Sequence, residues 1–312
     1  MREVSERDIL KVCHLYYKEE MTQNEISSLL GVSRFKISRI LKEAKNRGLV
    51  TVTVNDPMAD LTETEIELAK SFGLKQAILV KVSEFRGKSP LDQVGTAGAQ
   101  YLRNVVGSHK IMGVTWGYTV YHIVSNLEPI GVEDLVLAQI GGGLGTIEGT
   151  DNNMLTMMLG QKLGAKAHLI PAPVIVGNRR IRDTLLGEKK IEQTLAVAKR
   201  ADLVLFGIGL VGKDGLLWKS EFLDESDAKK LKESGAVGAV CGRFFDDRGK
   251  TCWNQLDGRT IGLNLEEIKR IKHKVCIVTG QEKLAGVLGA IRGRLLDVLI
   301  TDENTAESLL AP

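Results

Sequence analysis

The chain has little cysteine, proline or aromatic residue: 4 cysteines, 6 prolines and 5% Phe, Trp and Tyr in 312 residues. The cysteines are scattered without a CxxC pair, as are the 5 histidines, so the sequence indicates neither a disulfide framework nor a metal site. Each cysteine is expected to be a small buried hydrophobe. Few prolines together with 43% hydrophobic residues exclude a disordered or collagen-like chain and predict a folded protein.

Long apolar runs are also missing. No stretch approaches the roughly 18 apolar residues of a membrane span, and the charged start MREVSERDILKV lacks the apolar core of a signal peptide. We therefore expect a cytoplasmic protein without a membrane partner. Its length exceeds that of one typical domain.

The positive charge of the chain is concentrated near its start. The formal net charge is +3, and residues 1–54 hold ten basic and seven acidic side chains, so the rest of the chain is neutral overall. Residues 33–48 hold six basic side chains and only Glu43 as an acidic one. This distribution indicates an anionic partner for the first part of the chain.

Residues 1–55 are predicted to form a helix-turn-helix domain. Thr22 and Glu25 have the spacing of a capping box, Gly31 would end the helix that follows, and Ser33 would cap a third helix. The expected apolar faces of the three helices are Ile9, Val12, Cys13 and Tyr16; Ile26, Leu29 and Leu30; and Ile37, Ile40, Leu41 and Ala44. Residues 49–54 are predicted to form a short strand or wing.

The third helix presents a basic face that suits the major groove of DNA. Arginine can bond guanine through two hydrogen bonds, serine can bond a base or a phosphate, and an exposed phenylalanine can contact a thymine methyl group. The expected DNA-binding residues are Thr22, Gln23, Ser33, Arg34, Phe35, Lys36, Ser38, Arg39 and Lys42. The alternative is a solvated basic helix, but here cap, turn, apolar seam and basic face coincide. We expect the partner to be double-stranded operator DNA.

Residues 56–312 are predicted to form a second domain of alternating strands and helices. Pro57 interrupts the chain, and a helix over residues 61–72 is expected to be a connector and a candidate dimer contact. Aliphatic runs then recur at residues 77–82, 110–114, 134–140, 167–173, 201–209, 235–242, 275–280 and 297–302. Such runs between helices are typical of a doubly wound, mostly parallel α/β sheet.

Glycine and hydroxyl residues follow four of these runs. In doubly wound sheets, ligands bind beyond the carboxyl ends of the strands, where backbone amides and helix N-termini converge. We expect amides and Thr119 to bind a phosphate and Lys283 to supply a counter-charge. The expected effector-binding residues are Thr115, Trp116, Gly117, Tyr118, Thr119, Gly142, Gly143, Asn152, Asn153, Gly207, Gly209, Asp246, Gly280 and Lys283.

The expected ligand is a small sugar, polyol or sugar phosphate. No GxGxxG with an acidic partner follows the first strand of this domain and no GxxxxGK[ST] occurs, which argues against dinucleotides and nucleoside triphosphates, so no cofactor is predicted. Asn152, Asn153 and Asp246 would bind hydroxyl groups. Trp116 and Tyr118 either stack on a sugar face or belong to the core.

The residues then resemble a known family. The segments VTWGYT, IGGGLG, CGRFFDDRG, RTIGL, TGQEKLAGVLGAIRGR and VLITDENTAESLL, behind the helix-turn-helix, are similar in content and order to the SorC family of bacterial transcription factors. The resemblance implies an effector domain similar to glucosamine-6-phosphate deaminase and ribose-5-phosphate isomerase, a sugar or sugar-phosphate inducer, and usually a tetramer on operator DNA. It also implies phosphate contacts at residues 116–119, further contacts at Gly142, Gly143 and Asn152 or Asn153, and a basic contact at Lys283.

Two positions depart from the family pattern. Gly141 stands where several members carry Lys or Arg, which argues against a Schiff base or a second phosphate clamp there. Ala239 stands where an acidic residue is common, which removes a hydroxyl-binding carboxylate and argues against isomerase or deaminase chemistry.

The leading hypothesis is a non-enzymatic, self-associating regulator, a dimer or tetramer that controls a carbohydrate-utilisation operon. One alternative is a sugar-phosphate isomerase or deaminase that carries a DNA-binding head. Another is a constitutive DNA-binding protein with a vestigial cleft.

Overall fold

A computed structural model describes residues 5–50, 59–82, 89–145 and 151–311. The chain divides into two units, Met1–Ala59 and Asp60–Pro312. All four cysteines are buried and free, as predicted. Among the residues described, the helices include none with the length and apolar character needed to cross a membrane.

Three helices form the first unit: α1 (Glu6–Tyr17), α2 (Gln23–Leu30) and α3 (Arg34–Asn46). The predicted caps are confirmed, because Thr22 and Glu25 form a reciprocal capping box, Gly31 is left-handed with φ 65°, and Ser33 accepts a hydrogen bond from the Lys36 amide. The core of this unit consists of Ile9, Val12, Cys13, Ile26, Ile37, Ile40, Leu41 and Ala44.

The predicted apolar face of α2 needs correction. Ile26 is fully buried, but Leu29 is 60% exposed, because this two-turn helix presents only a narrow seam to α1 and α3. Tyr16 and Leu30 are partly buried beside the core. Leu49 and Val50 belong to no strand, and the remainder of the predicted wing lies outside the described residues.

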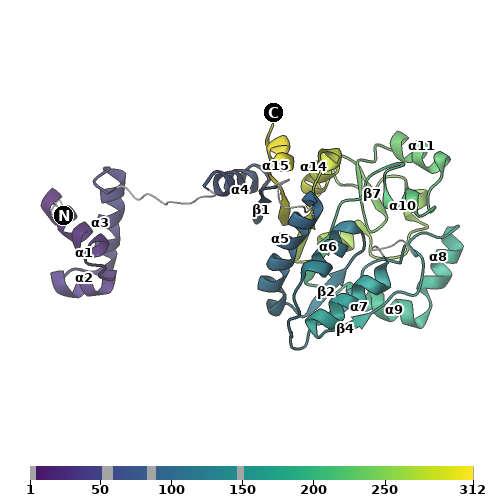
Figure 1. The fold of residues 1–312 in the computed structure, drawn as a ribbon, viewed down its shortest axis with the longest axis horizontal. Helices are drawn as coiled ribbons and strands as arrows, with labels where there is room; N and C mark the ends of the chain where they lie inside the picture. Colours follow the sequence, from purple (N-terminus) through teal and green to yellow (C-terminus); the bar gives the residue numbers. More distant parts are fainter. Residues whose placement is uncertain (1–4, 51–58, 83–88, 146–150, 312) are drawn as a thin grey trace. The chain divides into compact units, whose positions relative to one another are not determined.

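Seven parallel strands form the central sheet of the second unit, in the order β1-β9-β8-β5-β2-β3-β4. Figure 1 shows the helices of this unit around the sheet. The strands are β1 (Gln76–Val80), β2 (Ile111–Val114), β3 (Val136–Gln139), β4 (Lys166–His168), β5 (Leu203–Phe206), β8 (His273–Ile277) and β9 (Val298–Asp302). The prediction of a doubly wound, parallel α/β sheet is confirmed.

Helices cover both faces of this sheet. The helices of the second unit are α4 (Ala59–Phe72), α5 (Pro90–Val105), α6 (Tyr118–Asn126), α7 (Asn152–Leu163), α8 (Arg179–Leu186), α9 (Lys189–Ala198), α10 (Leu216–Lys219), α11 (Glu225–Glu233), α12 (Asn254–Asp257), α13 (Leu265–Lys269), α14 (Leu284–Arg292) and α15 (Glu303–Leu310), with single 3-10 turns η2 (Val106–Ser108) and η3 (Gln281–Lys283). Apolar residues of α5, α6 and α7 pack on one face, and those of α9, α13, α14 and α15 pack on the other.

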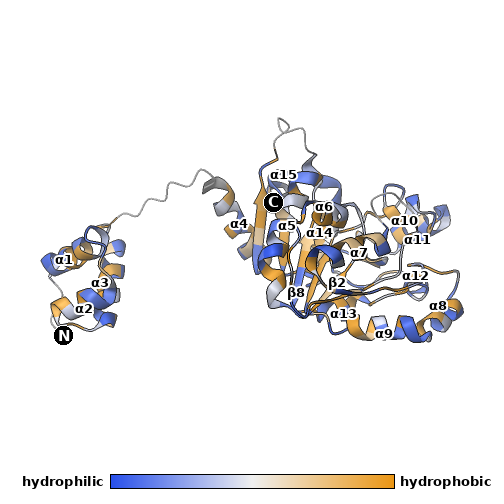
Figure 2. Cartoon of the chain, turned by 60° about the horizontal axis from the view of Figure 1, so that its bottom comes forward, coloured by the Kyte–Doolittle hydropathy of each residue, from blue (hydrophilic) through white to orange (hydrophobic). Residues whose placement is uncertain are grey.

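Both faces of each central strand are therefore buried. In β5, Leu203 and Leu205 join one apolar cluster while Val204 and Phe206 join the other. The apolar strands lie between helices with polar outer sides (Figure 2). Burial on two sides explains why the sequence runs are continuously aliphatic rather than alternating.

One predicted strand does not join the sheet. The run over residues 235–242 contains β6 (Gly238–Val240), which pairs antiparallel with β7 (Arg243–Phe245). This hairpin packs with α10, α11 and α12 in a third apolar cluster that includes Leu217, Ala239 and Phe244. The aliphatic residues of this run pack in the third cluster and not in the central sheet. The sequence pattern does not distinguish these two apolar environments.

Helix α4 is more than the predicted connector. Leu68 is fully buried in the core of the second unit, and Glu65 accepts a hydrogen bond from the Leu79 amide at 2.7 Å. The helix therefore packs against edge strand β1. Ile66 remains 48% exposed on its other side.

Candidate functional site

The first candidate surface is the exposed side of α3. Phe35 is 89% exposed, while Ile37, Ile40 and Leu41 of the same helix are buried. The other predicted residues of this helix and its cap are exposed as well: Ser33, Arg34, Lys36, Ser38, Arg39 and Lys42. Within the described part of the chain these four basic side chains form no ion pair, whereas Arg47 pairs with Glu43. The surface carries free positive charge beside an exposed aromatic ring.

The start of α2 lies next to this surface. Thr22, Gln23 and Arg34 line one surface hollow. The Thr22 side chain is committed to the capping box, since its hydroxyl donates to Glu25 at 2.7 Å, and these hydrogen bonds lower the pKa of Glu25. The structure thus brings the predicted DNA-binding residues of α2 and α3 together.

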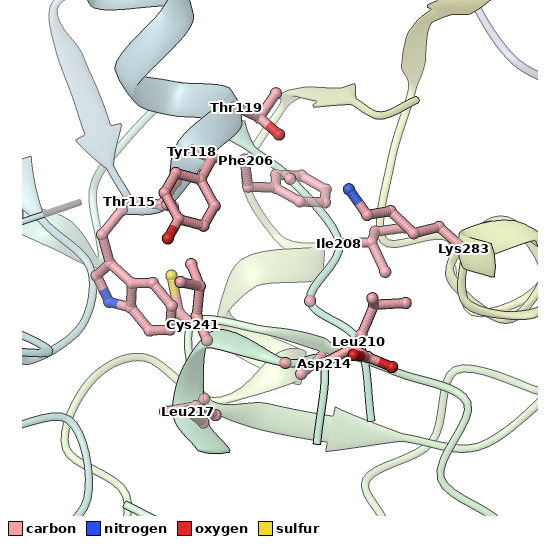
Figure 3. Close-up of a pocket in the computed structure, with 18 of the residues that line it drawn as sticks. Thr115, Tyr118, Thr119, Phe206, Ile208, Leu210, Asp214, Leu217, Cys241 and Lys283 are labelled. Carbon is pink, nitrogen blue, oxygen red and sulfur yellow. The ribbon is translucent and has the colours of Figure 1, made fainter. Parts of the chain in front are cut away.

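The second candidate site is a cavity of about 210 Å³ at the carboxyl ends of β2, β5 and the β8 turn (Figure 3). Eight of the predicted effector-binding residues line it: Thr115, Trp116, Gly117, Tyr118, Thr119, Gly207, Gly209 and Lys283. Its volume lies below the roughly 300–1,000 Å³ typical of drug-sized ligands. The cavity therefore suits a small ligand.

The N-terminus of α6 forms one wall of the cavity. Gly117, with φ 119°, precedes this helix and provides no side-chain cap. The first-turn amides and the positive end of the helix dipole are therefore available to a ligand in the cavity. Gly207 allows the helix to come close to β5, because a Cβ there would lie 3.1 Å from Thr119 Oγ1. The Thr115 hydroxyl instead donates to Leu205 O at 2.9 Å and has a structural role.

Lys283 reaches into the cavity from the side opposite Tyr118 (Figure 3). It makes no ion pair with the rest of the described chain. Burial lowers the pKa of Lys283, and nearby Glu282 opposes that change. A cation without a partner facing an uncapped helix N-terminus favours an anionic ligand.

The two aromatic residues of the wall differ in role. Trp116 Nε1 donates to Gly142 O at 3.1 Å and its ring joins two apolar clusters. Tyr118 is 42% exposed. Tyr118 is therefore the ring available for stacking, while Trp116 also belongs to the core.

Sequence reasoning missed several lining residues. The segment before and within α10 contributes Asp214 and Lys219, the β6–β7 turn contributes Cys241 and Gly242, and Glu282 precedes Lys283. Burial raises the pKa of Cys241 to about 12. The Lys-Asp-Gly turn at residues 213–215 was the signal for Asp214, but nothing local indicated that this loop reaches the cavity.

Six predicted effector-binding residues do not line this cavity. Most of their polar groups are used within the protein, although the buried Oδ1 of Asn152 has no hydrogen-bond partner among the described residues. Asn152 Nδ2 donates to Gly141 O, Asn153 accepts from Gln139, and Asp246 accepts two amides of its own turn. The amides of Gly142, Gly143 and Gly280 donate to Ile261 O, Ala172 O and Thr305 Oγ1, respectively.

Arg243 explains two motifs of the sequence. It is 3% exposed, and it binds the segment that contains RTIGL with every guanidinium nitrogen. Its five hydrogen bonds, at 2.8–3.1 Å, go to the carbonyls of Leu263, Asp257, Thr260 and Gly262 and to the Asp257 carboxylate. The residue fixes the β6–β7 turn that contributes to the cavity wall.

Comparisons with known proteins agree with this architecture. The sugar-binding domain family model (Sugar-bind) matches residues 56–311, and that of sigma-70 region 4 matches residues 5–47. The deoxyribonucleoside regulator of Bacillus subtilis (strain 168) is 30% identical over 304 residues, with 96% of each chain covered. The sorbitol operon regulator of Klebsiella pneumoniae is 30% identical over 308 residues, covering 97% of this chain and 98% of that one.

The solved structure of that full-length sorbitol operon regulator superposes with a TM-score of 0.76 and covers 98% of this chain and 99% of the other. A helix-turn-helix unit followed by a sugar-binding α/β unit defines the class of sugar-responsive transcriptional regulators. Within that class the chain belongs to the SorC family.

Proposed function

We propose that the protein controls a carbohydrate-utilisation operon and that a sugar, polyol or sugar phosphate binds in the cavity of the second unit. One relative is a sorbitol operon regulator and another a deoxyribonucleoside regulator, which supports an effector of this class. The observation that carries the proposal is Lys283, which forms no ion pair with the described residues and faces the uncapped N-terminus of α6 across a small cavity.

The anionic end of the ligand binds at α6. Free first-turn amides and the helix dipole stabilise a phosphate or a carboxylate, and Lys283 adds a full positive charge. Thr119 is 8% exposed and its side chain faces this region. The pair of an oriented helix end and a lysine amine is suited to a phosphate monoester.

The hydroxyl end of the ligand binds on the α10 side. Asp214 lies across the cavity from Tyr118 and Thr119 (Figure 3). Ala239 also lines the cavity, so the carboxylate that the family commonly places there is absent. Asp214 supplies a carboxylate from another element, and a carboxylate can accept hydrogen bonds from vicinal hydroxyls.

The first unit binds the operator through α3. Its exposed arginines and Ser38 contact bases, while Lys36 and the start of α2 contact phosphates. Two copies are needed to read both halves of a palindromic site, so we propose a dimer or a tetramer. Light scattering of the purified protein tests this assembly.

The cavity binds its ligand without transforming it. The relatives are named as regulators, and no observation favours the isomerase or deaminase alternative. Incubation with sugar phosphates followed by product analysis tests this point, because turnover would contradict a purely regulatory role.

The central experiment is a thermal-shift panel of sugars, polyols and their phosphates. A true effector raises the Tm by mass action and releases the protein from operator DNA. Thr119→Val should abolish the Tm increase and the release while DNA binding persists, because Thr119 lies in the cavity. Thr184→Val on α8 is the matched control, since that hydroxyl donates to Arg180 O of its own helix and does not line the cavity. If effector still releases the Thr119→Val protein, the cavity has been assigned wrongly.

A further inference from the structure

The C-terminal motif VLITDENTAESLL contributes no lining residue to the cavity. Its Asp302 is the last residue of β9 and the N-cap of α15. The side chain is 4% exposed. A buried carboxylate at this position needs hydrogen-bond donors to offset its desolvation.

Three donors converge on the Asp302 carboxylate. The hydroxyls of Thr305 and Thr279 donate to Oδ2 at 2.6 Å and 2.7 Å, and the Thr305 amide donates to Oδ1 at 2.9 Å. Burial raises the pKa of Asp302, but the hydrogen bonds from Thr305 and Thr279 outweigh it and hold that pKa below its usual value. The group is therefore an ionised acceptor at neutral pH.

The hydrogen bonds continue from Asp302 to Lys283. Thr305 Oγ1 also accepts the Gly280 amide at 3.2 Å, and Gly280 O accepts the Lys283 amide at 3.2 Å. Gly280 has φ 104°, and a Cβ at this position would collide with the Glu282 carboxylate. The turn over residues 279–283 is thus held by side chains of another element at its first two residues.

The Lys283 side chain itself has no partner among the residues described, so its own contacts do not fix its place in the cavity. Its backbone position comes from the turn. We propose that Asp302 is a positioning residue: through Thr279 and Thr305 it holds the turn over residues 279–283 so that Lys283 presents its amine to a phosphate-bearing ligand. This inference rests on the proposed function of the cavity.

Asp297 provides a matched control, because it lies just before the same strand, β9. It pairs with Lys274 at 2.7 Å at the amino-terminal end of β9, whereas Asp302 lies at the carboxyl end. Replacing either aspartate removes a partly or fully buried carboxylate, so both variants lose stability. Only Asp302 is connected to Lys283.

Pyridoxal 5′-phosphate is a suitable probe, because it carries both a phosphate and an aldehyde. The unprotonated lysine amine condenses with the aldehyde to an imine and releases water, and borohydride then reduces the imine to a stable secondary amine. Peptide mass spectrometry gives the labelled fraction at Lys283 relative to Lys213, whose side chain is 70% exposed. Inorganic phosphate should protect Lys283 and not Lys213.

In the intact protein we expect Lys283 to be labelled in preference to Lys213. Asp302→Asn should lower the Lys283 to Lys213 ratio about tenfold, since a misplacement of about 1 Å can cost as much as about a hundredfold and the turn keeps its other hydrogen bonds. Thr305→Val should lower the ratio in the same direction, and Thr305→Ser, which keeps the hydroxyl, should restore it. Asp297→Asn should leave the ratio unchanged.

An unchanged ratio in both Asp302→Asn and Thr305→Val would overturn the proposal, as would an equal decrease in Asp297→Asn or no preference for Lys283 in the intact protein. Thr279→Val provides the same test if Asp302→Asn does not fold. A panel without any carbohydrate effector, combined with the expected labelling ratios, would instead contradict the proposed function and leave the role of Asp302 intact.

Discussion

The two units of the chain place their candidate binding residues differently with respect to the hydrophobic core. In the first unit the candidate DNA-binding side chains project from one helix, and the core residues Ile37 and Ile40 lie on its other side. In the second unit the cavity wall is assembled from separate strand ends and loops, and several of its residues are buried. We infer that binding and stability are separable in the first unit and coupled in the second.

The strongest test of this coupling is Arg243→Met. The substitution removes this donor from the buried carbonyls of Thr260 and Leu263, from the partly buried carbonyls of Asp257 and Gly262, and from the Asp257 carboxylate. Losing one partner of a buried ion pair typically costs about 3–5 kcal/mol. Urea denaturation should show a loss of this order in the free energy of unfolding, together with weaker effector binding, because the β6–β7 turn contributes to the cavity wall.

Arg292→Met is the control for this prediction. Arg292 has one long hydrogen bond, 3.3 Å to Asp247 O, at an exposed site. We expect a change within about 0.5 kcal/mol. A loss below about 1 kcal/mol for Arg243→Met would contradict the idea that the cavity wall depends on this residue.

The next test concerns separability in the first unit. Arg39→Ala should weaken operator binding by about 1–3 kcal/mol if the guanidinium contacts a base, with no decrease in Tm, because the side chain is exposed and makes no ion pair with other described residues. Fluorescence anisotropy with operator duplex at several salt concentrations measures the affinity. Arg47→Ala, which removes a residue already paired with Glu43, should change affinity less. An Arg39→Ala protein that binds normally would show that α3 does not enter the groove as proposed.

A smaller effect is expected at Phe35. Its ring is 89% exposed, and burial against a thymine methyl group would contribute on the order of 1 kcal/mol. Duplexes selected by the protein from a random pool can be prepared with uracil in place of thymine, which removes only the methyl group. At a thymine that Phe35 contacts, the intact protein should bind the thymine duplex more tightly than the uracil duplex, and the Phe35→Ala protein should bind both equally. Equal discrimination by both proteins would remove Phe35 from base recognition.

The same difference between the units explains how far the sequence could be interpreted. The caps of the first unit were predictable, because Thr22 with Glu25 and Ser33 with Lys36 are local hydrogen bonds set by spacing. The sheet was predictable from its aliphatic runs. Asp246 was predicted to bind hydroxyl groups, whereas Asp214 was not predicted to line the site. Both are acidic loop residues, and only the packing of the α10 segment and of the turn after β7 decides which one faces the cavity.

The smallest predicted effect is on the pH dependence of stability and concerns His273, the first residue of β8, which contacts Tyr101 and His109. His273 Nε2 lies 2.8 Å from the Tyr101 hydroxyl, and its Nδ1 lies 3.0 Å from His109 Nε2. Every group is satisfied when the neutral His273 ring accepts from Tyr101 and donates to His109. Burial, then the charges of His109 and Lys75, lower the pKa of His273.

Because the unfolded chain binds this proton more readily than the folded protein does, His273 decreases stability as the pH falls below about 6.5. The loss is complete only below the lowered pKa of the folded state. His273→Gln retains hydrogen-bonding capacity without a titrating ring. On acidification the unfolding free energy of the intact protein should therefore fall more than that of the variant. A difference in unfolding free energy that does not depend on pH would contradict the prediction. If His273→Gln instead changed the pH dependence of operator affinity while stability stayed constant, DNA binding by the first unit would not be independent of the second unit.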